Sequence, residues 1–166
     1  MASSLTDFPP LLASGMHPMR MESLQQLAVS DSRFRLSTTR QPMMDRLWTL
    51  SACLCRWQIH GDIWVNGSFL TEKIDPQDID FVMEVRRDVH IQLSTEQHSI
   101  LQWLFASNEP KGLFSCHSFA IWEMHPGDPG YAGYQPLKDY WMNTFGKSRQ
   151  GQDKGLAVVQ VPDGCV

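Results

Sequence analysis

A chain of 166 residues is long enough to bury a core of its own, and a chain of this length usually forms one domain. Its net charge of -4 at pH 7 argues against a surface that coats nucleic acid, although it leaves room for a local basic patch. No apolar run approaches the roughly 18 residues that cross a membrane, and the first residues lack the pattern of a secretory signal. We therefore expect a cytoplasmic protein without a membrane segment.

The cysteines contain no C-x-x-C pair, so a zinc ribbon is not expected; they are Cys53, Cys55, Cys116 and Cys165. We expect all four to be reduced, as is usual in the cytoplasm.

Residues 1–20 are expected to form an extended arm that lies over the body of the protein. Adjacent prolines at Pro9 and Pro10 oppose a helix there, and Pro18 opposes one further along. Residues 21–166 contain no internal repeat and no low-complexity segment, so they are predicted to form a single domain.

Helix and strand patterns follow one another through this domain. The strongest helical pattern covers residues 41–59, where apolar side chains recur at steps of three and four and Gly61 follows as a stop. Strands are predicted next, over residues 62–65 and 79–85. The other predicted elements are a helix over residues 21–29, a loop over 31–39, a helix over 94–107 that opens with a capping box, a turn over 108–112, a strand over 114–124, a helix from 136 to 146 and a strand over 156–161. This order predicts an α/β (α+β) fold in which helices flank a short mixed sheet.

Two short motifs stand where the first two strands meet. Gly67 and Ser68 follow the first strand, and Asp78 and Asp80 open the second. Residues i and i+2 of a strand point to one face, roughly 6.5–7 Å apart, so Asp78 and Asp80 share a face. Their carboxylates repel each other unless a cation such as magnesium lies between them. Glycine lets the backbone approach a bulky anion, and free N–H groups there can hold phosphate. Each motif alone is weak, but together they predict chemistry on a nucleoside triphosphate.

The apolar-Gly-Ser turn, the short gap and the Asp-apolar-Asp-apolar strand resemble the minimal signature of the polymerase-beta-like nucleotidyltransferase superfamily. Most of the chain, from about residue 8 to 160, also resembles an uncharacterised bacterial and phage family with that core. The segments that carry this second resemblance are residues 8–11, 64–69, 76–80, 140–146 and 154–155.

The superfamily resemblance implies a reaction and a set of site residues. Gly67 and Ser68 would hold the triphosphate, while Asp78 and Asp80 would bind one or two magnesium (or manganese) ions. A hydroxyl of a protein, an RNA or a small molecule would attack the α-phosphorus, and pyrophosphate would leave. The acidic composition favours a protein or a small molecule over RNA as the acceptor.

Lysines and an arginine near the C-terminal end are a further candidate group. Lys147, Arg149 and Lys154 could grip phosphates or an RNA acceptor, although a solvated hairpin is the commoner role of such a cluster. Tyr140 and Trp141 could stack on a base, but their spacing also suits core packing.

The superfamily resemblance also implies a third acid on a later strand, and here the sequence departs from the pattern. Ser118 stands where we expect the aspartate, so catalysis would suffer more than nucleotide binding. Glu123 could be a displaced third acid, and His117 a base or a ligand. The second hypothesis is therefore a catalytically impaired binding protein of this fold, such as an antitoxin-like or phage counter-defence factor. A third is nucleotide sensing without transfer.

Three other polar residues have weaker functional signals. Asp75 lies in the loop between the two strands and is expected at the surface. His125 and Asp128 could border the site, but their Gly/Pro-rich surroundings favour a role in turn formation.

Overall fold

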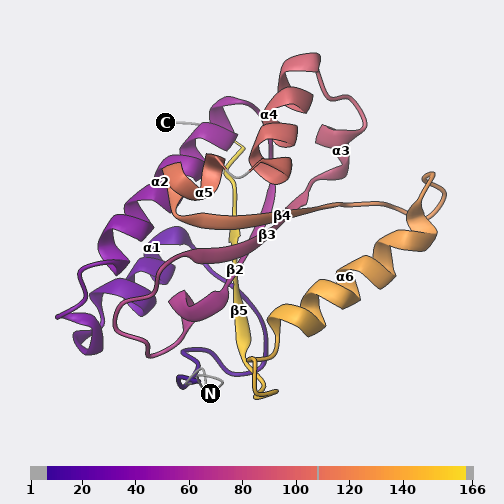
Figure 1. The fold of residues 1–166 in the computed structure, drawn as a ribbon. Helices are drawn as coiled ribbons and strands as arrows, with labels where there is room; N and C mark the ends of the chain where they lie inside the picture. Colours follow the sequence, from indigo (N-terminus) through magenta and orange to yellow (C-terminus); the bar gives the residue numbers. More distant parts are fainter. Residues whose placement is uncertain (1–6, 108, 164–166) are drawn as a thin grey trace.

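A single mixed β-sheet forms the centre of the protein (Figure 1). The computed structural model describes residues 7–107 and 109–163. Within them, five strands lie in the order β1-β5-β2-β3-β4. The strands are β1 (Gly15–Pro18), β2 (Gly61–Asn66), β3 (Ile79–Val85), β4 (Cys116–Trp122) and β5 (Gly155–Gln160). Strand β2 is antiparallel to both of its neighbours, whereas β1 with β5 and β3 with β4 are parallel pairs. The predicted α/β (α+β) class with a short mixed sheet is confirmed.

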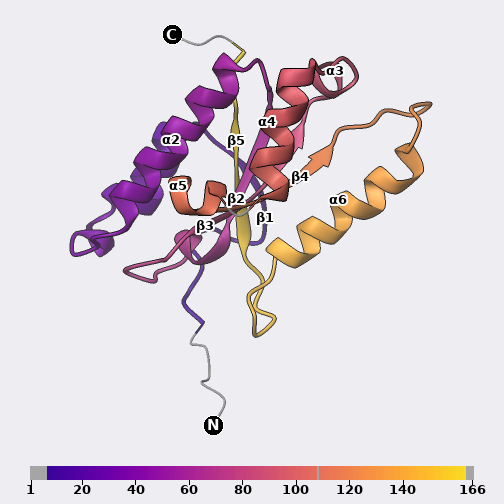
Figure 2. The ribbon, with the colours of Figure 1, turned by 45° about the horizontal axis from the view of Figure 1, so that its top comes forward.

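Helices cover the two faces of the sheet unequally. They are α1 (Met21–Gln25), α2 (Arg40–Arg56), α3 (Arg87–His90), α4 (Thr95–Ala106), α5 (Glu109–Phe114) and α6 (Tyr131–Phe145). Figures 1 and 2 show α1, α2, α4 and α5 on one side of the sheet and α6 alone on the other. The buried residues divide in the same way, because strand neighbours point to opposite faces: Ile63 and Val65 join the larger cluster under α2, and Trp64 joins the smaller cluster with Phe145 of α6.

Most predicted elements are present, with shifted ends. Strand β3 has its predicted bounds, and the capping box of Ser94 and Gln97 opens α4 as expected. Helix α2 begins and ends earlier than predicted, at Arg40 and Arg56.

The predicted turn, the start of one predicted helix and the expectation for the arm need correction. The predicted turn at residues 108–112 is wrong from residue 109 onward, because α5 begins there; residue 108 lies outside the described residues. Pro110 occupies its first turn, where no N–H is needed. Helix α6 begins at Tyr131 rather than at Pro136, which lies inside the helix. Part of the expected arm, Gly15–Pro18, pairs with β5 as an edge strand instead of lying over the body.

The cysteines are not all reduced. Cys53 and Cys116 are free thiols, but Cys55 is disulfide-bonded, so the expectation of four reduced cysteines is wrong for this residue. Cys165 lies outside the described residues. No helix in the described ranges combines the length and the apolar character needed to cross a membrane.

A buried arginine joins the start of α2 to the loop that follows β2. Arg40 is fully buried, and its guanidinium donates only to backbone carbonyls. Its acceptors are the oxygens of Ala28 (2.7 Å), Phe69 (2.8 Å), Thr71 (2.6 Å), Lys73 (2.6 and 3.2 Å) and Ile74 (3.2 Å). The guanidinium carbon also lies 3.7 Å from the centre of the Phe34 ring. Burial lowers the pKa of Arg40 to about 10, a sign of its desolvation cost, which these contacts offset.

We expect Arg40→Lys to destabilise the protein by about 3 kcal/mol or more, because an ammonium has three donors and would leave buried carbonyls unpaired. The measurement is urea unfolding of the variant and the wild type. Arg35→Lys is the control: Arg35 is exposed, and its substitution should change the unfolding free energy by less than about 0.5 kcal/mol. Equal effects of the two substitutions would contradict this role of Arg40.

Candidate functional site

The five residues predicted to form the site line one pocket of about 650 Å³. It lies where β2 ends and β3 begins, on the face of the sheet that α6 covers only in part. The five are Gly67, Ser68, Asp78, Asp80 and Lys154. Residues that are far apart in the sequence therefore meet at one place.

Gly67 allows the turn after β2 to approach an aspartate. Its φ of +75° belongs to the left-handed region that favours glycine. A Cβ built on Gly67 would lie 2.2 Å from the Asp80 Oδ2 atom, so no other residue fits without movement. Asn66, the last residue of β2, is paired with Asp80 across the two strands. Strand pairing and the missing side chain together place the Asp80 carboxylate against the Gly-Ser turn.

The carboxylates of Asp78 and Asp80 meet several positive or protonatable groups. Burial raises the pKa of Asp80, and the charge of Asp78 raises it further, whereas His117 and Lys154 act in the opposite direction. The His117 Nδ1 atom lies 3.4 Å from Asp80 Oδ1, and the Lys111 Nζ atom lies 3.3 Å from Asp78 Oδ2. A partly buried carboxylate with a second carboxylate beside it is suited to bind a cation.

The oxygen ligands in the pocket are compatible with magnesium. That ion is commonly held by one or two carboxylates and completes its shell with substrate phosphates and water. In the part of the chain that the structure describes, no group of three or more His, Cys, Asp or Glu side chains is arranged to hold a metal. Asp78 and Asp80 are the carboxylates of the pocket that could hold such an ion.

His117 of β4 faces the pocket and Ser118 does not, so the alignment of Ser118 with a third acid is wrong. Asp80 is paired with His117 in the parallel β3–β4 register, which leaves Ser118 beside Phe81. Ser118 therefore points to the opposite face of the sheet, where its Oγ donates to the Leu104 carbonyl of α4 at 2.8 Å.

The alternatives beyond β4 lie away from the pocket. Glu123 accepts a hydrogen bond from the Arg87 backbone N–H at 2.9 Å and lies 3.3 Å from the His125 ring. It does not line the pocket with the two aspartates, so its role as a displaced third acid is wrong. Asp128 is bonded to the Arg87 side chain and to the His125 N–H, which agrees with turn formation. Asp75 is exposed as predicted, and it accepts hydrogen bonds at the start of α2.

A basic hairpin forms another wall of the pocket. Lys147, Arg149 and Lys154 line it, together with Lys73 from the loop after β2. Burial lowers the pKa of Lys154, while the negative charge of Asp80 opposes this effect. The cluster therefore faces the pocket as well as the solvent.

Aromatic rings complete the pocket, and several of its residues were not predicted. The Phe119 ring centre lies 4.6 Å from His117 and 4.4 Å from Trp141, and Tyr140 and Trp141 line the pocket as well. Sequence reasoning missed Phe119 and also Asn66. The latter is buried, donates its amide to the Phe145 carbonyl and leaves its Oδ1 without a partner among the described atoms. A polar residue in an otherwise apolar strand, just before a glycine, was its signal.

The fold and the pocket define a small α/β protein with paired carboxylates beside a glycine turn. The chain matches a family of unknown function (DUF6932) over residues 6–160, which is nearly its whole length, and it belongs to that family. No curated protein and no solved structure matches the chain. The family match establishes kinship without naming an activity, so the function has to be argued from the site.

We expect Gly67→Ala to destabilise the protein and to weaken nucleotide binding by more than tenfold, because the methyl group would displace the Asp80 carboxylate and strain the turn. Thermal unfolding and titration with a non-hydrolysable triphosphate measure the two effects. Gly127→Ala is the matched control. Gly127 has a φ of +99°, and no atom lies within 4 Å of the place that an added methyl group would take, so the substitution adds strain outside the pocket. Unchanged binding by Gly67→Ala would contradict the assigned contact.

Proposed function

We propose that this protein is a metal-dependent nucleotidyltransferase that moves a nucleotide monophosphate from a nucleoside triphosphate to a hydroxyl of a protein, an RNA or a small molecule. The observation that carries the proposal is the close approach of Gly67 to the Asp80 carboxylate. It brings a backbone turn suited to phosphate and a pair of acids into one pocket. The pocket volume of about 650 Å³ lies in the usual range of small-molecule sites.

Each residue would have a separate task. Asp78 and Asp80 would hold magnesium or manganese, which when bound neutralises phosphate charge and makes an attacking hydroxyl more acidic. Gly67 and Ser68 would bind phosphate oxygens, because the glycine exposes backbone N–H groups and the serine adds a hydroxyl donor. Lys154 would add a positive charge next to Asp80. The charge of each of these residues shifts the pKa of the other.

The proposed reaction is an in-line displacement at the α-phosphorus. The acceptor oxygen forms the new bond to phosphorus, and the bond from phosphorus to the bridging oxygen breaks. Pyrophosphate leaves with that electron pair, and the hydroxyl proton passes to solvent. The protein contributes by positioning the phosphates and by stabilising the charge that develops on them.

His117 favours a second candidate, a nucleotide-binding protein of this fold that does not catalyse transfer. It stands across from Asp80, on the strand on which the superfamily resemblance leads us to expect an acid. An imidazole in place of a carboxylate adds no negative charge for a second metal ion, so activation of the hydroxyl would be weakened more than binding. Such a protein would act through a partner, as an antitoxin-like or phage counter-defence factor, or as a nucleotide sensor.

Incubation of the purified protein with cell extract, magnesium and triphosphates labelled at the α-phosphate tests the first candidate. We expect transfer of label that falls about 100-fold or more in Asp78→Asn and Asp80→Asn, because each removes a metal ligand. Asp45→Asn is the control: Asp45 is exposed on α2, the side chains that bond to it among the described residues are those of its helix neighbours Gln41 and Thr49, and it lies outside the pocket.

The outcomes separate the candidates. Transfer that survives both substitutions would refute the proposed metal site. If no transfer occurs but ATP raises the melting temperature only when magnesium is present, the second candidate is favoured. Absence of both effects would contradict a nucleotide site of either kind.

A further inference from the structure

The N-terminal segment places a carboxylate inside the basic wall of the pocket. The Asp7 Oδ2 atom accepts hydrogen bonds from the Ser148 hydroxyl and, at 3.3 Å, from the Gln150 backbone N–H. Asp7 and Ser148 both line the pocket, and the charge of Asp7 also acts on Lys154. An acidic side chain of the protein itself therefore occupies a cluster of hydrogen-bond donors beside the proposed phosphate site.

The donors belong to a hydrogen-bonded hairpin turn. The Ser148 N–H donates to the Gln152 carbonyl at 2.8 Å, and the Gly151 N–H donates to the Ser148 carbonyl at 3.0 Å. The Ser148 Oγ accepts from the N–H groups of Gln150 (3.2 Å) and Gln152 (3.0 Å), so its own proton is directed to Asp7. The turn thus presents a hydroxyl and a backbone N–H to an anion without rearrangement.

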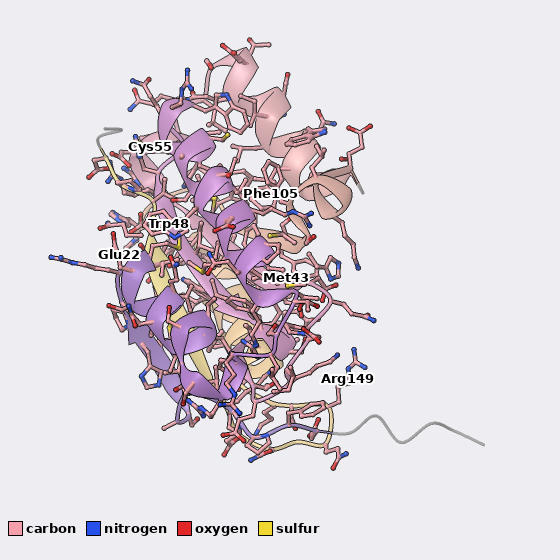
Figure 3. The ribbon with its side chains drawn as sticks, turned by 90° about the vertical axis from the view of Figure 1, so that its left-hand side faces the viewer. Glu22, Met43, Trp48, Cys55, Phe105 and Arg149 are labelled. Carbon is pink, nitrogen blue, oxygen red and sulfur yellow. The ribbon has the colours of Figure 1, made fainter. Side chains whose placement is uncertain are left out.

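Basic side chains surround this turn. Lys147 and Arg149 come from the hairpin itself, and Arg149 projects from it at the edge of the molecule in Figure 3. Lys147 is paired with Asp153 at 2.6 Å, whereas no ion pair of Arg149 is found among the described residues. Donors and positive charge together are the chemistry that binds phosphate.

The position of Asp7 is set by the segment that follows it. The Pro9 carbonyl accepts from the Glu72 N–H at 2.9 Å, and the Leu11 N–H donates to the Leu70 carbonyl at 2.9 Å. These bonds tie the segment to the loop after Ser68, while the Asp7 contacts tie it to the hairpin. The segment thereby bridges the two walls that would hold a polyphosphate.

We propose that the hairpin turn at residues 148–150 is a phosphate subsite and that Asp7 occupies it until a polyphosphate displaces the carboxylate. The assignment rests on the proposed function, since it places the terminal phosphates of the nucleotide at the hairpin and the α-phosphate near Asp78 and Asp80. Asp7 then acts as a built-in competitor that lowers the affinity for free nucleotide and pyrophosphate.

Calorimetric titration with inorganic pyrophosphate tests the subsite without requiring catalysis. We expect Asp7→Ala to bind pyrophosphate about tenfold more tightly than the wild type, the scale of one charge-assisted hydrogen bond, and Asp7→Asn to show a smaller gain. Adding Ser148→Ala to the Asp7→Ala variant should reverse the gain. Asp139→Ala is the control, because it removes the same charge from an exposed position on α6 outside the pocket. Thermal unfolding shows that each variant is folded.

Three results would overturn the subsite: no binding of pyrophosphate, equal affinity of Asp7→Ala and the wild type, or an equal gain in Asp139→Ala. If one of these occurs while the wild type transfers label, the subsite is wrong and the transfer reaction stands. If Asp7→Ala binds more tightly and no transfer is found, the subsite stands and the transfer reaction is wrong.

Discussion

The position of the candidate site depends on the burial of Arg40. A guanidinium without water must find acceptors, and here its acceptors among the described residues are backbone carbonyls. Backbone carbonyls therefore converge on the first turn of α2, from residues 28, 69, 71, 73 and 74. Because four of these residues follow Gly67 and Ser68 closely, the interaction holds the glycine turn in place. Asp75 fixes the end of the same loop through the Thr38 N–H.

Electrostatics gives the pocket its second constraint. Asp80 is partly buried next to Asp78, and both effects disfavour its ionised form. The groups that oppose this cost come from different elements, His117 from β4 and Lys154 from the residue before β5, while Lys111 of α5 is paired with Asp78. The sheet and its surrounding loops thus collect positive charge around two acids. Such a site would bind a cation at the two aspartates and a phosphate group at the lysines.

Much of the fold and the core of the site could be predicted from local sequence. The apolar run of β3 and the Asp-x-Asp parity are short-range features, and the structure brings Asp78 and Asp80 to the pocket with Gly67 and Lys154. The identity of the residue across from Asp80 was not accessible in this way. His117 and Ser118 suit a strand equally well, and only the register with β3 decides which one faces the pocket.

The misassigned segments share a similar cause. Gly112 and Pro110 favour a turn locally, but Pro110 is buried and α5 packs against α2 and α4. Pro136 resembles a helix start, although α6 continues through it from Tyr131. Strand β1 is only four residues long and ends with Pro18, a composition that only an edge strand tolerates. In each case tertiary packing or pairing outweighs the local signal.

The central claim is that Asp78 and Asp80 hold a divalent cation beside the glycine turn. Crystals grown with manganese and a non-hydrolysable triphosphate would test it through the anomalous scattering of the metal. We expect an anomalous peak in direct contact with both carboxylates, with phosphate density against Gly67 and Ser68. Bound nucleotide elsewhere, or no manganese between the two carboxylates, would contradict it.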